Sequence, residues 1–133
     1  MAFQFSTAAR NAALDAIEAA AGGSPVLTLR SGPPPADCAA ADAGAVLATI
    51  PCPADWLASA ASGAKVMLGV WQDTAADATG AAGHFRLKQG SLCHIQGLIT
   101  VTGGGGDMTL SNVEITAGQQ VTITGFSIVA GGA

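Results

Sequence analysis

Hydrophobic and polar residues alternate with a period of two in several short segments of the chain, most clearly after Gly83. This alternation, together with many Thr, Ile and Val residues, is typical of β-strands that bury one face. The segments expected to form strands are Val26–Arg30, Val46–Ile50, Lys65–Gln72, His84–Lys88, Leu92–Thr100, Met108–Leu110, Val113–Thr116 and Gln119–Val129. About eight short strands, separated by Gly and Pro, predict an all-β sandwich or barrel.

Two of these segments depart from simple alternation. Lys65–Gln72 is apolar almost throughout, which predicts a strand that is buried on both faces. In the last segment, Val121 and Ile123 have one parity and Phe126 has the other. We therefore expect a bulge or a corner between two packed sheets at Gly125.

Only the N-terminal part shows a helical pattern, and it predicts one short α-helix over Thr7–Ala21. Ser6 or Thr7 can accept the first free backbone N–H groups, and Gly22–Gly23 supplies the stop. The apolar face is formed by Ala9, Ala13, Ile17 and Ala20, with Leu14 and Ala21 beside it and Asp15 and Glu18 on the other side. Because Ala offers little surface, this face has to dock on a sheet or on a neighbouring subunit.

The strands before and after Gln89–Ser91 are expected to form a hairpin with this segment as its loop. Phe85 and Leu87 then lie opposite Ile95 and Cys93, so that apolar residues share one face. The polar residues of the hairpin share the other face: His84, Arg86, Lys88, His94 and Gln96.

This polar face allows two interpretations. Arg86 and Lys88 are two of only five basic residues in an acidic chain. In the first interpretation the face is solvated and keeps the hairpin soluble. In the second it contacts acidic groups of a partner and guides the orientation of the complex. His84 and His94 could face each other across the hairpin, but the sequence supplies no third metal ligand near them.

Composition and charge narrow the class of protein. The 133 residues suit a single domain, 1–133, whose N-terminal arm and helix occupy about residues 1–23. Charged residues make up 11% of the chain, well below the roughly 25% of an ordinary soluble domain. A net charge of −4 disfavours binding to nucleic acid. Such a weakly charged surface, rich in small residues, is typical of a subunit that packs against other proteins.

The cysteines and the apolar segments bear on the cellular compartment. Cys38, Cys52 and Cys93 are odd in number and lack the spacing of a zinc knuckle or a redox pair. We expect three reduced thiols in a protein made in the cytoplasm. The chain start lacks the pattern of a secretory signal, and no apolar run reaches the length of a transmembrane helix. No membrane contact is therefore expected.

The sequence predicts no catalytic, cofactor or metal site. Gly103–Asp107 lacks the Lys-Ser/Thr and the helix that a phosphate loop requires, so we expect a flexible hairpin loop. Trp56 and Trp71 could stack on sugars, but the position of Trp71 after a buried strand favours the core. Phe3 and Phe5 alternate with polar or small residues at an extended terminus. They are expected either to join the chain's own sheet as an edge strand or to bind a neighbouring copy.

Several segments, taken in order, resemble a known family: Arg10–Ile17, Leu27–Gly32, Gly44–Ala48, Asp77–Leu87, Asp107–Asn112 and Ala117–Ile123. The order of these segments is similar to that of jelly-roll capsid cement (decoration) proteins of tailed bacteriophages, such as that of a Bordetella phage. The resemblance implies a jelly-roll-like antiparallel β-sandwich and a homo-oligomer, with a dimer expected. It also implies binding to the major capsid protein on the outer surface of the virion, after synthesis in the bacterial cytoplasm.

The resemblance transfers no site residues, so Phe3, Phe5, His84, Arg86, Lys88 and His94 are interface candidates from the sequence pattern alone. An alternative function is a phage tail- or fibre-associated structural module, with or without carbohydrate binding. A third is a small bacterial enzyme or lectin.

Overall fold

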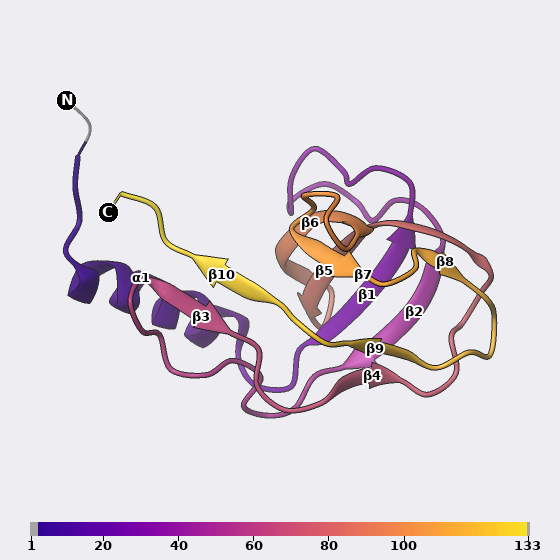
Figure 1. The fold of residues 1–133 in the computed structure, drawn as a ribbon, viewed down its shortest axis with the longest axis horizontal. Helices are drawn as coiled ribbons and strands as arrows, with labels where there is room; N and C mark the ends of the chain where they lie inside the picture. Colours follow the sequence, from indigo (N-terminus) through magenta and orange to yellow (C-terminus); the bar gives the residue numbers. More distant parts are fainter. Residues whose placement is uncertain (1–2, 133) are drawn as a thin grey trace.

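The computed structural model describes residues 3–132 and contains one helix and ten strands (Figure 1). The helix α1 spans Thr7–Ala21. The strands are β1 (Val26–Ser31), β2 (Val46–Pro51), β3 (Ala64–Val66), β4 (Trp71–Asp73), β5 (Gly80–Gln89), β6 (Leu92–Val101), β7 (Met108–Leu110), β8 (Glu114–Ile115), β9 (Val121–Ile123) and β10 (Ser127–Val129). The fold class predicted from the sequence is confirmed: a mostly β protein with a curled sheet, consistent with an all-β sandwich, and one short N-terminal helix.

The largest sheet has the strand order β2-β1-β5-β6-β7, and β8 pairs with the start of β5. Its pairs are antiparallel except for β6 and β7, which run parallel, with Ile99 opposite Met108. This edge is the one place where the main sheet departs from antiparallel pairing among the described residues. The segment Gly103–Asp107 is not a hairpin loop, because it folds back over Thr100, whose Oγ1 accepts a hydrogen bond from the Gly106 N–H at 3.0 Å.

Two small strand pairs, β3–β10 and β4–β9, extend the structure beyond the main sheet. The predicted corner at Gly125 is confirmed, since β9 pairs with β4 before it and β10 pairs with β3 after it. The single strand expected over Lys65–Gln72 is wrong, because this segment divides into β3 and β4. Burial on both faces is also wrong: Val66, Leu68 and Val70 are 51%, 41% and 65% exposed.

A chain of aromatic rings crosses the core. Trp56 lies 6.1 Å from Trp71, Trp71 lies 5.7 Å from Phe126, and Phe126 lies 5.7 Å from Phe85, measured between ring centroids. The Trp56 Nε1–H donates to the Gly22 carbonyl at 2.9 Å, so its polar group is satisfied. Both tryptophans are fully buried, which confirms the core interpretation and leaves neither free to stack on a sugar.

The helix forms as predicted, but it docks by a different face. Ser6 caps its start by accepting from the Ala9 N–H at 3.1 Å. Asp15 and Glu18 turn toward the sheet, where both accept from the buried Lys65 Nζ, at 2.6 Å and 2.9 Å. Burial alone would lower the pKa of Lys65, but these two hydrogen bonds outweigh burial and raise it.

The predicted docking face of the helix, formed by Ala9, Ala13, Ile17 and Ala20, is therefore exposed. Leu14 and Ala21, which the pattern places beside that face, supply the buried apolar contacts of the helix.

The aromatic chain provides a stability test. Trp71→Ala should lower the free energy of unfolding by about 3–5 kcal/mol, because it empties the centre of the core. The neighbouring Val70 is 65% exposed, so Val70→Ala should change it by no more than about 0.5 kcal/mol. Urea unfolding followed by tryptophan fluorescence measures both, and equal effects of the two variants would contradict the packing described here.

Candidate functional site

The alternation of β5 places His84, Arg86 and Lys88 on one face of the main sheet, as the sequence predicts. The register of β1 adds Thr28 beside Arg86 and Arg30 beside His84. This face is not solvated, because the connection between β1 and β2 folds over it. His84 and Arg86 are only 0% and 2% exposed, so the prediction of an open basic face is wrong. We call these five residues, together with Gln96, the polar layer.

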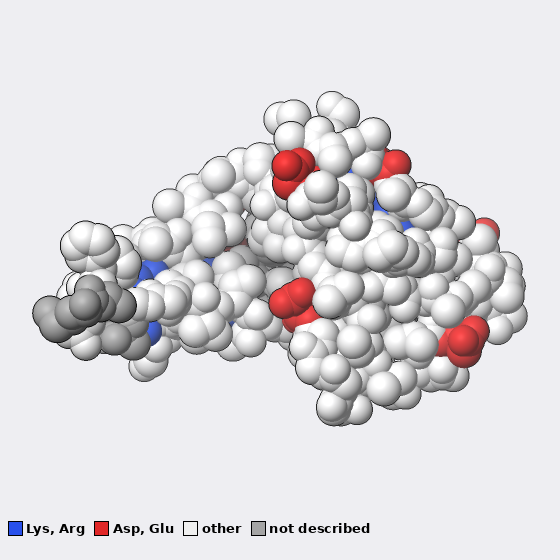
Figure 2. Space-filling model, turned by 90° about the horizontal axis from the view of Figure 1, so that it is seen from above, with Lys and Arg blue, Asp and Glu red and all other residues white. Residues whose placement is uncertain are grey.

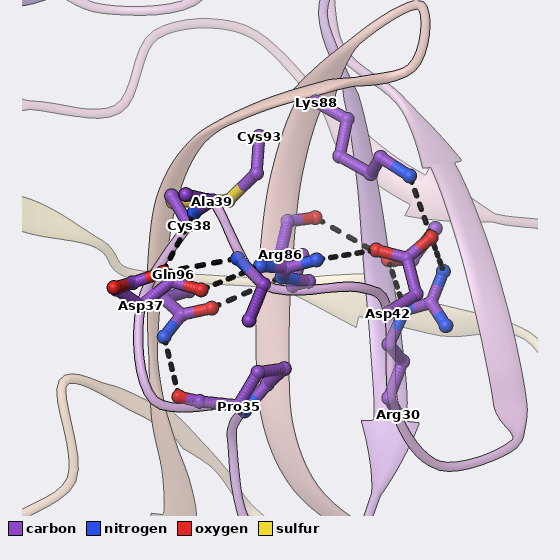
Figure 3. Close-up of polar contacts among 12 residues, drawn as sticks. Arg30, Pro35, Asp37, Cys38, Ala39, Asp42, Arg86, Lys88, Cys93 and Gln96 are labelled. Carbon is purple, nitrogen blue, oxygen red and sulfur yellow. Dashed lines mark hydrogen bonds and ion pairs between the residues drawn. A yellow bond between two sulfur atoms is a disulfide. The ribbon is translucent and has the colours of Figure 1, made fainter.

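One carboxylate organises the cations of the polar layer (Figure 3). Asp42 accepts from Arg86 Nη1 at 2.6 Å, from Lys88 Nζ at 2.6 Å and from Arg30 Nη2 at 3.3 Å. Hydrogen bonds from Lys88 and then Arg86 lower the pKa of Asp42 to about 2. Asp42 therefore stays ionised and holds its own loop against the sheet.

Further hydrogen bonds fix the same loop. Arg86 donates from Nη2 to the Asp37 carbonyl at 2.9 Å and from Nε to Gln96 Oε1 at 3.0 Å. Gln96 in turn donates from Nε2 to the Pro35 carbonyl at 2.8 Å. Each planar donor group thus spans from the sheet to the loop backbone, and Figure 3 shows the loop passing directly over these side chains.

A disulfide also ties the loop to the sheet. Cys38 and Cys93 are bonded, with their Cα atoms 5.2 Å apart. The expectation of three reduced thiols is therefore wrong for this pair. Cys52 remains a free thiol, and burial raises its pKa to about 12, so it is inert as a nucleophile.

The hairpin register explains why Cys93 was misplaced. The loop has two residues, Gly90 and Ser91, with Gln89 paired to Leu92. A bulge at His94 then restores the parity, so that Leu87 lies opposite Ile95, another apolar residue, and not opposite Cys93; that predicted pairing is wrong. Before the bulge, however, Cys93 faces the polar layer rather than the core.

The two histidines are not brought together. His84 pairs with Leu98, while His94 lies in the bulge, so the expected contact across the hairpin is wrong. The Phe85 position opposite Ile95 is also wrong, since Phe85 lies opposite Gly97. A Cβ on Gly97 would sit 2.9 Å from the Phe85 ring, and this close approach explains why a glycine stands there.

The contacts of the polar layer hold its own loop against the sheet. His84 Nδ1, for example, lies 2.8 Å from the Gly32 carbonyl. Within residues 3–132, no three His, Cys, Asp or Glu side chains are grouped so that they could hold a metal ion. Arg30 was missed as a member of this layer, and Asp42 and Cys38 were missed as the loop residues that tie the loop to the sheet. The only sequence signal for them was that the connection carrying Asp42 joins two neighbouring strands.

The other candidate residues lie at the opposite, narrow end of the molecule, where the N-terminal arm (residues 3–6) meets the β3–β10 ribbon (Figure 1). Phe3 is 88% exposed and Phe5 is 56% exposed, and the arm forms no strand with its own sheet. The Phe5 N–H donates to the Gly132 carbonyl. Val66 and Val129 of the ribbon are also exposed, at 51% and 71%. We call this region the apolar end.

Most basic side chains of this protein form ion pairs within the molecule and leave little positive charge at the surface. Four of the five basic residues, Arg30, Lys65, Arg86 and Lys88, are engaged in ion pairs inside the molecule. Figure 2 accordingly shows a face that is mostly uncharged, with isolated acidic patches. The exposed surface therefore offers apolar contact rather than positive charge.

Comparison with family models, with curated proteins and with solved structures gives no match in any of the three. In the described part of the chain, no helix has the length and apolar character needed to cross a bilayer.

Removing the carboxylate of Asp42 tests the polar layer. Asp42→Asn should lower the free energy of unfolding by about 2 kcal/mol at pH 7, a value reduced from that of a fully buried pair because Asp42 is one-third exposed. Asp55 is exposed and forms no ion pair among the described residues, so Asp55→Asn is the matched control and should change little. Equal stability of the two variants would contradict the role of Asp42.

The stabilisation that Asp42 provides should depend on pH. The folded pKa of Asp42 is about 2 and its ordinary value is 3.8, so its contribution is complete above about pH 4 and is lost as the pH falls toward 2. The stability difference between wild type and Asp42→Asn should therefore shrink through this window. A difference that stays constant from pH 6 to pH 2 would refute the assignment.

The disulfide predicts a thiol count. Unfolded without reductant, the air-oxidised protein should react with a thiol reagent once per chain, at Cys52, and three times after reduction. Cys38→Ser should lower the free energy of unfolding by about 2–4 kcal/mol under oxidising conditions. Reductant should abolish this difference, and three reactive thiols in oxidised protein would show that the bond is absent.

Proposed function

We propose that this protein is a structural subunit of a phage virion that binds the outside of the assembled capsid shell and cements it. The observation that carries the proposal is the distribution of charge: the cations stabilise the interior of the chain, and the surface is left with apolar side chains, small residues and a few acids. Such a surface suits lasting contact with other proteins. The segment-by-segment resemblance to cement proteins supports the same assignment.

The mechanism requires no chemistry. A protein that binds the assembled shell, and not the dispersed subunits, stabilises the shell by mass action. Because many copies bind one lattice, and self-association links them, weak individual contacts add up to strong retention. The net charge of −4 supports a position outside the shell, away from packaged DNA.

The proposal is tested with shells assembled from the major capsid protein of the same genome. The protein should co-sediment with these shells, not with free capsid subunits, and should raise the temperature at which the shells dissociate. A double change of Phe3 and Phe5 to Ser should reduce occupancy. Leu92→Ser removes an equally exposed apolar residue at the hairpin tip and serves as the control.

Two results would overturn the assignment. One is wild-type protein that fails to bind shells at any stage of assembly. The other is gold-labelled protein found on tails or fibres of intact virions by negative-stain microscopy, which would favour the tail-associated alternative.

A further inference from the structure

A groove runs alongside β10 between the ribbon and the main sheet. It consists of two adjacent hollows of about 530 Å³ and 400 Å³, which share Asp107, Phe126 and Ser127 in their lining. Figure 2 shows a hollow at the waist between the narrow end and the wider body. The groove borders the polar layer at Gln96 and the core at Phe85 and Phe126.

The two walls of the groove are unpaired strand edges. In residues 3–132, β10 pairs only with β3, and residues 92–98 of β6 pair only with β5. A free edge offers backbone N–H and C=O groups to an added strand. The groove is therefore suited to an extended polypeptide segment.

The side chains that line the groove select an uncharged segment. Ile95, Phe126, Ile128 and Val129 supply apolar surface. Asp107 is the one carboxylate in both hollows, and it is fixed by accepting from the Leu98 N–H at 2.9 Å. An acidic segment would be repelled, whereas apolar side chains at alternate positions would find contacts.

The N-terminal arm has these properties. Its sequence is Phe3-Gln4-Phe5-Ser6, which has no charge and places both rings on one side of an extended chain. The arm does not occupy the groove of its own chain, because the Phe5 N–H donates a hydrogen bond to the Gly132 carbonyl, beyond the end of β10. Figure 1 shows the arm leading away from the ribbon. Its rings are thus presented to another molecule.

We propose that the arm of one copy lies in the β10 groove of a second copy, and that the exchange is reciprocal in a two-fold dimer. A buried aromatic side chain covers roughly 150–250 Å², and the surface opposite it loses a similar area. One arm with two rings therefore accounts for roughly 600–1,000 Å², too little for a stable interface, whereas two exchanged arms account for roughly 1,200–2,000 Å², the range of a specific dimer. The need for this larger buried area is the reason why we propose that both copies exchange their arms.

Mixed cross-linking tests this arrangement without any capsid. A Gln4→Cys protein and a Ser127→Cys protein are mixed in equal amounts and oxidised mildly, then separated on a non-reducing gel and analysed by mass spectrometry. A covalent heterodimer through these two positions is expected. Ser111→Cys, which is exposed but outside the groove, should give at least tenfold less heterodimer with the same partner.

Two further variants measure the contribution of each side. Phe3→Ser removes two rings from a reciprocal dimer and should raise the dimer dissociation constant at least about 100-fold in analytical ultracentrifugation. Val129→Glu places a charge in the groove and should act in the same direction, while circular dichroism stays unchanged because Val129 is 71% exposed.

A wild-type monomer at high concentration, equal cross-linking at Ser111, or a dimer unaffected by both changes would overturn the proposal. These experiments use purified protein only, so their failure leaves capsid binding untouched, and a failure to bind capsids leaves the dimer untouched.

Discussion

The structure depends on a single carboxylate that forms ion pairs with three cations. Arg30, Arg86 and Lys88 all reach Asp42, and without it two nearly buried guanidinium groups would lie on a covered sheet face with no counter-charge. Desolvating such groups costs several kcal/mol each unless a partner is present. The loop that carries Asp42 is thereby obliged to close over the sheet, and the disulfide at Cys38 adds a covalent tether to the same loop. The result is a sheet with an apolar core on one face and a closed ionic layer on the other.

A second ion pair sets the other end of the molecule in the same way. Lys65 lies in β3 with 2% exposure, and it draws Asp15 and Glu18 of the helix toward it. An Ala-rich helix gains little from burying its apolar face, so the charged contact decides its rotation. This choice leaves Ile17 and its neighbouring alanines exposed. Internal electrostatics thus determine which apolar residues remain at the surface.

Local patterns in the sequence identified the elements that depend on local physics. The helix limits follow from Ser6 and Gly22, and the corner at Gly125 follows from a change of parity, so both could be predicted. The bulge at His94 could not be predicted. A three-residue loop pairs Leu87 with Cys93, and a two-residue loop with a bulge pairs Leu87 with Ile95, so both arrangements give Leu87 an apolar partner. The Cys38–Cys93 bond and the partners of Asp42 depend on that register and on how a loop of small residues closes, which alternation does not encode. Of the candidate residues, Phe3 and Phe5 were correctly expected at an exposed terminus, whereas the exposure of Arg86 was misjudged.

The internal use of nearly all cations also determines how the exterior responds to ionic strength. Surfaces that attract each other through opposite charges lose affinity when salt screens them. Here the exposed charges are almost all negative, so between two such surfaces there is little attraction to screen and mainly repulsion to relieve. Salts that are excluded from protein surfaces also strengthen apolar contact. Contacts made by this exterior therefore tighten in concentrated salt, and a particle built with it would hold together as its surroundings become more saline.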